Sequence, residues 1–559
     1  MSWQSAAQSR VSKADCSFSP QPKAQAELPD TFAFGSGLND FYIPERSMHE
    51  GSQRRGMVLI LVLIVIAMLS LGAYHFTHLM LAHHEAAILT GRQAQTRLLV
   101  DSGVEEVRLF LAQNEEARLQ AGGIFDNPER FRSVVVLNDL DPKQRGVFSV
   151  ISPRLEMTTN LETVRYGLED ESSRLNLNTL LTIEQLLPGS GRTLLMALPD
   201  MTEDVADAIL DWLDTDEQPR EYGAEADYYA TLDPPYAAKN GPLETVEELL
   251  LVKGVTPLLL FGSDINRNGQ LDAHEMDENL GSGGSTDAET FRGWSAFLTL
   301  YSMEWNVSPL GQPRVYLNTN DLNKLVEDLA AIQFPEEWIN FIVAYRQAGP
   351  MTSAVPGAQT GGVAAAGKLN MEYMPQHPIA QILSLVDAQV QYAFEGSTTP
   401  VALRSPFTTA TLSTTLPQLM DYVTVNPAAT IPGRININTA PAVILAGIPG
   451  MTSELLEQIL AARSQESAAA DPGRKYETWP LADGLVTLQQ MQTLQPLITG
   501  GGNVYRAQVV GYFQSGQASS RAEVVFDATS LLPRVLFWRD ISHLGRGYPL
   551  ETLGLNFSE

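Results

Sequence analysis

The chain has 559 residues, enough for two or more packing units, with one cysteine and a formal net charge of −28 at pH 7. This acidity argues against general nucleic-acid binding, because phosphate backbones repel an acidic surface. A single thiol excludes an intramolecular disulfide, so the core, with or without a bound metal ion, has to supply the stability.

Residues 1–56 are predicted to be a cytoplasmic leader. Residues 1–47 are rich in Ser, Gln, Ala, Pro and Gly and have no sustained periodicity, a composition typical of a disordered tail. The only cysteine, Cys16, lies in this tail. Translation from Met48 instead of Met1 would leave the short leader "MHEGSQRRG", and the sequence does not decide between the two starts.

An apolar helix is predicted to follow. Residues 57–84 contain no Asp, Glu, Lys or Arg, and a helix of this length crosses the hydrocarbon core of a bilayer, which is about 30 Å thick. Arg54 and Arg55 precede it, so the positive-inside rule places the N-terminus in the cytoplasm and the rest of the chain outside. The helical periodicity continues, so we expect residues 57–118 to form one transmembrane and stem helix.

Short alternating segments predict a small antiparallel sheet at both ends of the remaining chain, with its first part in residues 130–180 and its last part in residues 501–559. Residues 181–500 between these parts are mostly helical in pattern and are predicted to form an inserted domain. The expected fold class is therefore α+β, with a long N-terminal helix, a small pilin-like antiparallel sheet and a large, mostly α-helical insert.

The insert contains an internal repeat. Three related motifs each precede a pair of predicted helices: "RLNLNT" from Arg174, "RVYLNT" from Arg314 and "RININT" from Arg434. The first and last pairs resemble helix-hairpin-helix units, with Thr202 and Thr452 as the expected N-caps. Such hairpins bind phosphate in DNA-binding proteins, but here the second helices are acidic rather than basic. We therefore interpret them as a scaffold, with DNA binding as the alternative.

The clearest chemical motif is "DINRNGQLDAHE", residues 264–275. It fills every ligand position of an EF-hand calcium loop, including the glycine at the sharp turn. Calcium takes about six to eight oxygen ligands, and this spacing wraps side-chain oxygens and one main-chain carbonyl around a point. The expected ligands are Asp264, Asn266, Asn268, Gln270, Asp272 and Glu275. An empty polar turn is the alternative.

An acidic stripe precedes this loop and has two possible interpretations. Asp204, Asp207, Asp211 and Asp214 recur along one face of a predicted helix, and Asp216 follows it. The stripe is either a solvated face opposite the apolar one or a second cation site, in which unpaired carboxylates converge. In the second case the expected ligands are Asp211, Asp214 and Asp216.

Catalytic groups are scarce. Beyond the stem the histidines are His274, His377 and His543, and no cysteine, zinc-protease motif or nucleophile elbow accompanies them. The segment "GVAAAGKL", residues 362–369, has Leu369 where a phosphate loop needs Ser or Thr, so it is interpreted as a linker. We expect no enzymatic activity.

The start of the apolar helix resembles a known processing signal. Basic residues, then Gly56, then an apolar helix resemble the class III leader of type IV pilins and type II secretion pseudopilins, which a prepilin peptidase cuts after the glycine. The cut here would fall between Gly56 and Met57. Such subunits usually carry Glu at the fifth mature position, where this chain has Leu61, and minor pseudopilin K characteristically lacks that glutamate. An uncut signal anchor with a chance "RRG" is the alternative.

The insert adds a more specific resemblance. "DESSRLNLN" and the segment from Ala208 to Val255 are similar, in order and spacing, to minor pseudopilin K of the type II secretion system, the general secretion pathway protein K family. The resemblance implies a non-catalytic subunit in the inner membrane, with its C-terminal domain in the periplasm. It implies a place at the tip of the pseudopilus, assembly with minor pseudopilins I and J, and a role in starting the pseudopilus for protein export.

The same resemblance implies calcium in the helical domain, without saying which carboxylates hold it. A membrane-anchored DNA-uptake or adhesion protein, binding through its helical hairpins, is the alternative function. Its mark would be a basic hairpin face, which this sequence lacks.

Overall fold

The computed structural model describes residues 55–154, 164–270, 272, 275, 292–351, 360–363, 368–396, 400–463 and 472–555. The chain divides into two compact units, Met1–Met80 and Leu81–Glu559. Most of the predicted leader, including Cys16 and both possible starts, lies outside the described residues. So do His274 and residues 364–367 of the predicted linker 362–369.

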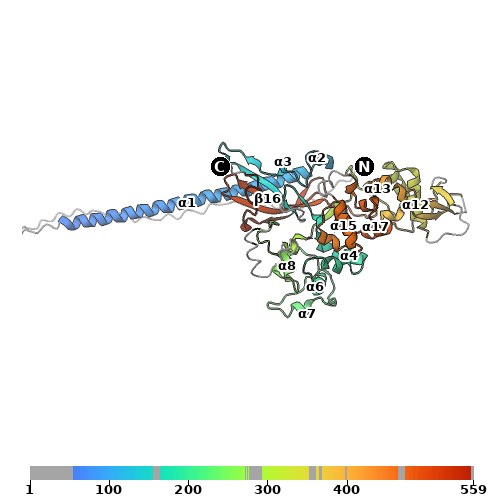
Figure 1. The fold of residues 1–559 in the computed structure, drawn as a ribbon, viewed down its shortest axis with the longest axis horizontal. Helices are drawn as coiled ribbons and strands as arrows, with labels where there is room; N and C mark the ends of the chain where they lie inside the picture. Colours follow the sequence, from blue (N-terminus) through green and yellow to red (C-terminus); the bar gives the residue numbers. More distant parts are fainter. Residues whose placement is uncertain are drawn as a thin grey trace, which may run out of the picture. The chain divides into compact units, whose positions relative to one another are not determined.

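The long apolar helix is confirmed. α1 runs from Arg55–Leu111 (Figure 1). Among the described residues, Val58–Leu111 is the one helix long and apolar enough to cross a membrane. The helix ends earlier than the expected residue 118, because Asn114 starts a separate short helix, α2 (Glu115–Gln120), by accepting the Ala117 N–H with its side chain.

The predicted antiparallel sheet is also confirmed, and strands from both ends of the chain build it. The strand order is β1-β2-β16-β17-β18, with β3 paired to β2 and β4 paired to β16. The strands are β1 (Val134–Leu137), β2 (Gly146–Pro153), β3 (Val164–Arg165), β4 (Glu169–Asp170), β16 (Val504–Phe513), β17 (Ser519–Asp527) and β18 (Arg534–Asp540). In the central pairing, Val150 of β2 lies opposite Val509 of β16.

The second half of α1 packs on this sheet and closes its core. Val100, Val104 and Val107 are buried against a group that includes Phe148 and Val509. The approach is close where β16 passes the helix, since a Cβ on Gly511 would lie 2.4 Å from the Thr96 carbonyl oxygen. Glycine at this position therefore permits the contact between α1 and β16.

The chain between β4 and β16 is mixed α/β, because short strands accompany the helices that the sequence predicted. A short helix, α3 (Pro128–Phe131), precedes β1. The helices between β4 and β16 are α4 (Leu180–Leu186), α5 (Ser190–Met196), α6 (Glu203–Leu213), α7 (Ala226–Tyr229), α8 (Pro257–Phe261), α11 (Leu322–Ala331), α12 (Glu336–Ala348), α13 (Leu412–Tyr422), α14 (Ala442–Ala446), α15 (Ser453–Ala462), α16 (Trp479–Ala482) and α17 (Leu488–Leu494). Its strands are β5 (Leu175–Asn176), β6 (Leu298–Thr299), β7 (Met303–Trp305), β8 (Val315–Tyr316), β9 (Thr360–Val363), β10 (Gln389–Tyr392), β11 (Val401–Arg404), β12 (Val423–Thr424), β13 (Thr430–Pro432), β14 (Ile435–Asn436) and β15 (Ile498–Thr499). Three of these strands, β5, β8 and β14, lie in the recurring motifs.

Each recurring motif has the same structural role. It forms a short strand that pairs in parallel with a strand far along the chain, β5 with β6, β8 with β12 and β14 with β15. Two packed helices lie within each segment, α5 with α6, α11 with α12 and α14 with α15. The second Asn of the motif anchors the turn, since Asn178 and Asn318 each donate to and accept from the backbone of one residue, Leu243 and Ile379.

The two expected N-caps differ. Thr452 caps α15 as predicted, its side chain accepting the Leu455 N–H at 3.2 Å. Thr202 occupies the N-cap position of α6 as predicted, but its side chain makes no capping hydrogen bond. The Thr202 hydroxyl interacts instead with the Asp204 carboxylate and helps to lower its pKa.

Candidate functional site

The predicted calcium loop brings its acidic side chains onto its own backbone. Asp264 accepts the N–H groups of Asn268, at 3.1 Å, and Gly269, at 2.7 Å. Glu275, eleven positions later, accepts the N–H groups of Ile265 and Asp272, each at 3.0 Å. Gly269 takes a φ of +71°, the left-handed conformation that the sharp turn requires. Both ends of the motif are therefore hydrogen-bonded to the backbone of the loop between them.

The remaining expected ligands lie in the same ring. Asp272 accepts hydrogen bonds from the side-chain amides of Asn266, at 2.6 Å, and Asn268, at 3.0 Å. The Asn268 side-chain oxygen in turn accepts the Gln270 N–H at 2.6 Å. The structure thus brings together all six residues that the spacing predicted, with oxygen atoms as the main donors for a cation.

Several side chains of the loop are buried, including two of its carboxylates. Asn268 and Glu275 are fully buried, and Asp264 is 8% exposed. Burial, with the Glu275 carboxylate adding to it, raises the pKa of Asp264 to about 6 despite the opposing hydrogen bonds from the backbone. The Asp264 carboxylate, whose ionisation burial opposes, would be stabilised by a bound cation, so the residues fit calcium.

The outer side of the loop is fastened to the sheet. Gln508 of β16 donates to the Arg267 carbonyl at 2.7 Å, and Asn268 donates to the Gly547 carbonyl at 2.6 Å. Tyr548 donates to Gln508 at 2.9 Å, which connects the C-terminal segment to the same strand. The geometry of the loop is therefore coupled to the sheet, a relationship that no feature of the sequence indicates.

The prediction that the acidic stripe on α6 is a solvated face is wrong for two of its members. Asp207 and Asp211 are fully buried. Asp207 accepts a hydrogen bond from Arg192 at 2.8 Å, and Asp211 accepts one from Arg220 at 2.7 Å. The carboxylates are paired with arginines from neighbouring segments, so Asp211 is already neutralised and lies outside the acidic cluster described next.

Asp214, Asp216 and Glu225 form a second acidic cluster, with one ligand atom from each within 4.8 Å of the others. Glu225 is 4% exposed, and neither of its carboxylate oxygens has a hydrogen-bond partner. One oxygen of Asp214 and the side-chain oxygen of Asn240 also lack partners. Burial, followed by the charges of Asp211 and Asp214, raises the pKa of Glu225 to about 7.

The cluster is better explained as a cation site than as an empty polar turn. Buried carboxylate and amide oxygens without hydrogen-bond donors are the groups that calcium prefers. Sequence reasoning placed Asp214 and Asp216 in it but missed Glu225. Glu225 lies in a segment without helical or strand periodicity, so its only signal was its burial-prone position beside Gly223 and Ala224.

Comparison with known proteins identifies the family of one part of the chain. Residues 173–260 match the family model of type II secretion system (T2SS), protein K. The chain is 37% identical over 97 residues to the type II secretion system protein K of Pseudomonas aeruginosa, a match that covers 16% of this chain and 29% of that protein. It is 30% identical over 96 residues to the type II secretion system protein K of Pectobacterium carotovorum subsp. carotovorum, covering 17% and 28%. The matched segment thus spans less than a third of either relative.

A solved structure of the GspK-GspI-GspJ complex from the enterotoxigenic Escherichia coli type 2 secretion system aligns with 82% of this chain and 98% of its own matched chain. The sequence identity is 13% and the TM-score is 0.33, which is too low to carry an argument. The family model does support the resemblance, because the residues that it matches, 173–260, contain the segment from Ala208 to Val255. The resemblance that this segment indicated is confirmed.

Proposed function

We propose, from the type II secretion system protein K domain that residues 173–260 carry, that this chain is a non-catalytic minor pseudopilin of type II secretion. The family match is the observation that carries the proposal. The apolar α1 and the antiparallel sheet that its second half covers are the elements that such a subunit needs. The first anchors it, and the second presents a folded head.

The membrane topology is part of the proposal. A prepilin peptidase cuts between Gly56 and Met57 and removes residues 1–56, and α1 then anchors the chain in the inner membrane. The N-terminus faces the cytoplasm, because the basic residues precede the apolar run. The body lies in the periplasm, with residues 181–500 inserted between the sheet segments 130–180 and 501–559.

The proposed partners are minor pseudopilins I and J and the pseudopilus itself. The match of residues 173–260 to the type II secretion system protein K family supports this part of the proposal. Leu61 in place of the usual glutamate suits a subunit at the tip, which has no subunit above it whose amine needs neutralising. At the tip, the subunit helps to start the pseudopilus for protein export.

Calcium is the proposed structural cofactor. The first site uses Asp264, Asn266, Asn268, Gln270, Asp272 and Glu275, and its support is the closed, buried ring of oxygen donors. The second uses Asp214, Asp216 and Glu225, and its support is the pair of unpartnered Glu225 oxygens. A cation in either site offsets the charge of buried carboxylates and so stabilises the insert.

The helical pairs are proposed to be helix-hairpin-helix-like scaffold units. Their buried side chains belong to one continuous core, to which α6 contributes Val205 and Ile209 and α15 contributes Leu455 and Ile459. The alternative, DNA uptake through these hairpins, predicts a shift of labelled duplex DNA on a gel at low salt. The acidic first turns of α6 and α15 oppose it, and we expect no shift.

The first experiment is processing. The full chain is co-expressed with a prepilin peptidase, and the mature N-terminus is read by mass spectrometry. A product that starts at Met57 with a methylated amine supports the pseudopilin proposal. The Gly56→Val variant is the matched control and is expected to stay uncut. An uncut parent chain, beside a control prepilin that the same peptidase cleaves, would overturn the proposal in favour of a fixed signal anchor.

A further inference from the structure

A large cleft within the unit of residues 81–559 has no part in the proposed function. Its volume is about 1920 Å³, and α2, β4, β7, β13 and the third recurring motif contribute to its walls. Pockets for small molecules typically measure about 300–1,000 Å³. The size of the cleft therefore suits a segment of polypeptide rather than a small ligand.

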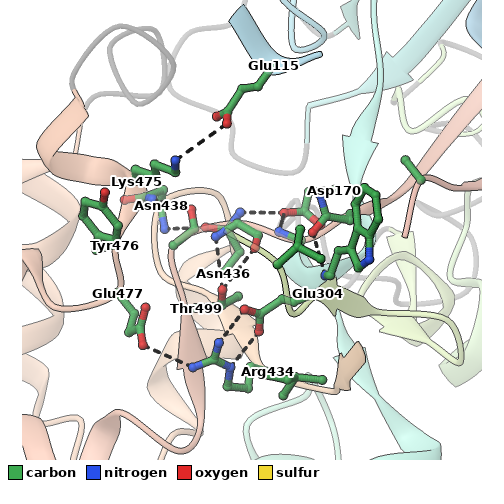
Figure 2. Close-up of a pocket in the computed structure, with 18 of the residues that line it drawn as sticks. Glu115, Asp170, Glu304, Arg434, Asn436, Asn438, Lys475, Tyr476, Glu477 and Thr499 are labelled. Atoms are coloured by element: carbon green, nitrogen blue, oxygen red, sulfur yellow. Dashed lines mark hydrogen bonds and ion pairs between the residues drawn. The ribbon is translucent and has the colours of Figure 1, made fainter. Parts of the chain in front are cut away.

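The floor of the cleft is fixed by paired charges, as Figure 2 shows. Arg434 lies between Glu304 and Glu477, with its Nε 2.6 Å from Glu304 and one terminal nitrogen 3.2 Å from Glu477. Asn436 donates to Asp170 at 2.8 Å on the neighbouring wall. These groups satisfy one another, so a ligand would meet a preformed surface.

Arg314 is the exception among the arginines that begin the three motifs. Arg174 and Arg434 each donate two hydrogen bonds to one buried carboxylate, Glu169 and Glu304. Arg314 lines the cleft, and within the described part of the chain its side chain has no hydrogen bond or ion pair. Its Nε is buried without an acceptor. The motif position that takes a carboxylate in two copies is thus unpaired in the third.

Asn438 in the third motif differs from the equivalent asparagines of the other two motifs, because its side-chain oxygen lacks a donor. Asn178 and Asn318 accept a backbone N–H with their side-chain oxygens, each at 2.8 Å. The side-chain oxygen of Asn438, which is 3% exposed and lines the cleft, accepts none. The side-chain oxygens of Gln381 and Gln495 lie in the same cleft, buried and also without donors. Among the described residues, the walls therefore include an unpaired donor atom on Arg314 and unpaired oxygens on Asn438, Gln381 and Gln495, all of them buried.

Apolar side chains are exposed along the same cleft. Leu310 is 77% exposed and Leu531 is 78% exposed, and Leu119 and Leu186 are exposed as well. Large apolar side chains gathered at one cleft mark a surface for contact with another molecule. An extended peptide presents partners for the groups that reach the cleft surface: an acidic side chain for the half-buried Arg314 and apolar side chains for the exposed leucines.

We propose that this cleft binds an extended segment of another polypeptide, in which an Asp, a Glu or the C-terminal carboxylate pairs with Arg314 and apolar residues flank it. The inference goes beyond the proposed function and rests on these contacts alone, so it stands or fails independently of processing at Gly56.

The test uses the full chain in detergent and an array of random 12-residue peptides. Bound spots are expected to be enriched in one acidic residue beside apolar ones. The strongest spot is then synthesised with a fluorescent label, and its Kd is measured by anisotropy. Arg314→Gln is expected to weaken binding at least about tenfold, because a charged hydrogen bond is lost. Arg404→Gln, which replaces an exposed arginine outside the cleft lining, is the matched control and should change the Kd less than about twofold.

A second variant keeps the test decisive if Arg314→Gln misfolds. Leu310→Asp places a negative charge at an exposed position in the cleft and is expected to weaken the same acidic peptide without loss of folding. An array with no acidic enrichment, or equal Kd values for the parent chain and both cleft variants, would overturn the proposal.

Discussion

Arg506 of β16 forms a hydrogen-bonded ion pair with Glu171, which lies just before the first recurring motif. Its guanidinium also donates to Glu523 of β17 at 2.7 Å. The Glu171 side chain is fully buried, and that of Glu523 is 17% exposed. One arginine of the sheet therefore neutralises two carboxylates at the junction with the insert.

Replacement of Arg506 by Met is expected to lower the free energy of unfolding by about 3–5 kcal/mol, because it leaves two buried carboxylates without their partner. Urea unfolding followed by tryptophan fluorescence measures the change. Lys368→Gln is the control, since its ion pair with Glu395 is 82% and 52% exposed and should be worth less than about 1 kcal/mol. Equal losses for the two variants would contradict the assignment of Arg506.

Calcium is expected to stabilise the purified chain. At a free concentration of about a hundred times Kd, a single site adds about 2.7 kcal/mol, which raises the Tm by several degrees. Glu275→Gln and Glu225→Gln should each reduce the shift in Tm between calcium and EDTA, and the double variant should abolish it. Glu327→Gln, an exposed carboxylate on α11, should leave it unchanged. A full shift in the double variant would refute both sites.

Asp527 provides a prediction for acid conditions. Burial opposes ionisation of this carboxyl, but hydrogen bonds from the Thr529 hydroxyl and N–H and from Arg534 outweigh it and hold the pKa of Asp527 below its usual 3.8. A carboxyl with a lowered pKa in the folded state contributes stability above pH 3.8, and this contribution is lost as the pH falls through the lowered value. Asp527→Asn should therefore destabilise the chain at pH 6, and its cost should shrink toward pH 3. Urea midpoints at the two pH values test this, and a cost independent of pH would count against it.

Two glycine substitutions are expected to change the free energy of unfolding in opposite directions. Gly511→Ala places a Cβ 2.4 Å from the Thr96 carbonyl oxygen, so it should cost about 1–3 kcal/mol by pushing β16 away from α1. Gly91→Ala adds a Cβ with no atom within 4 Å to an exposed part of α1, so it should stabilise the helix by up to about 1 kcal/mol. Thermal unfolding compares the two, and a stabilised Gly511→Ala variant would show that the helix does not pack there.

The sequence predicted features whose signal is local. The apolar run of α1 and the spacing from Asp264 to Glu275 needed no knowledge of distant residues. The burial of Asp207 and Asp211 could not be predicted in this way, because their partners Arg192 and Arg220 lie 15 and 9 positions away, outside α6. A stripe of carboxylates looks like a solvated face in the sequence, because the arginines that pair with it lie outside the helix.

Glu225 of the second acidic cluster and the strands of the insert were missed for a related reason. Glu225 joins Asp214 and Asp216 through the folding of an irregular segment, which has no periodicity to follow. The hairpin of β10 and β11 does alternate, with Val390 opposite Leu403, but it lies within a stretch whose overall pattern is helical. Local alternation was outweighed by the longer pattern around it.

The pairing of Val150 with Val509 has a consequence for the order of synthesis. β2 leaves the ribosome early, and its partner β16 leaves only after every residue of the insert has been made. Until then, one edge of β2 has no partner strand, and the apolar side chains of the stem lack the part of the sheet that β16 and β17 supply. A chain cut short anywhere before residue 504 lacks β16, β17 and β18. The sheet can therefore be completed only after the C-terminal strands have been made.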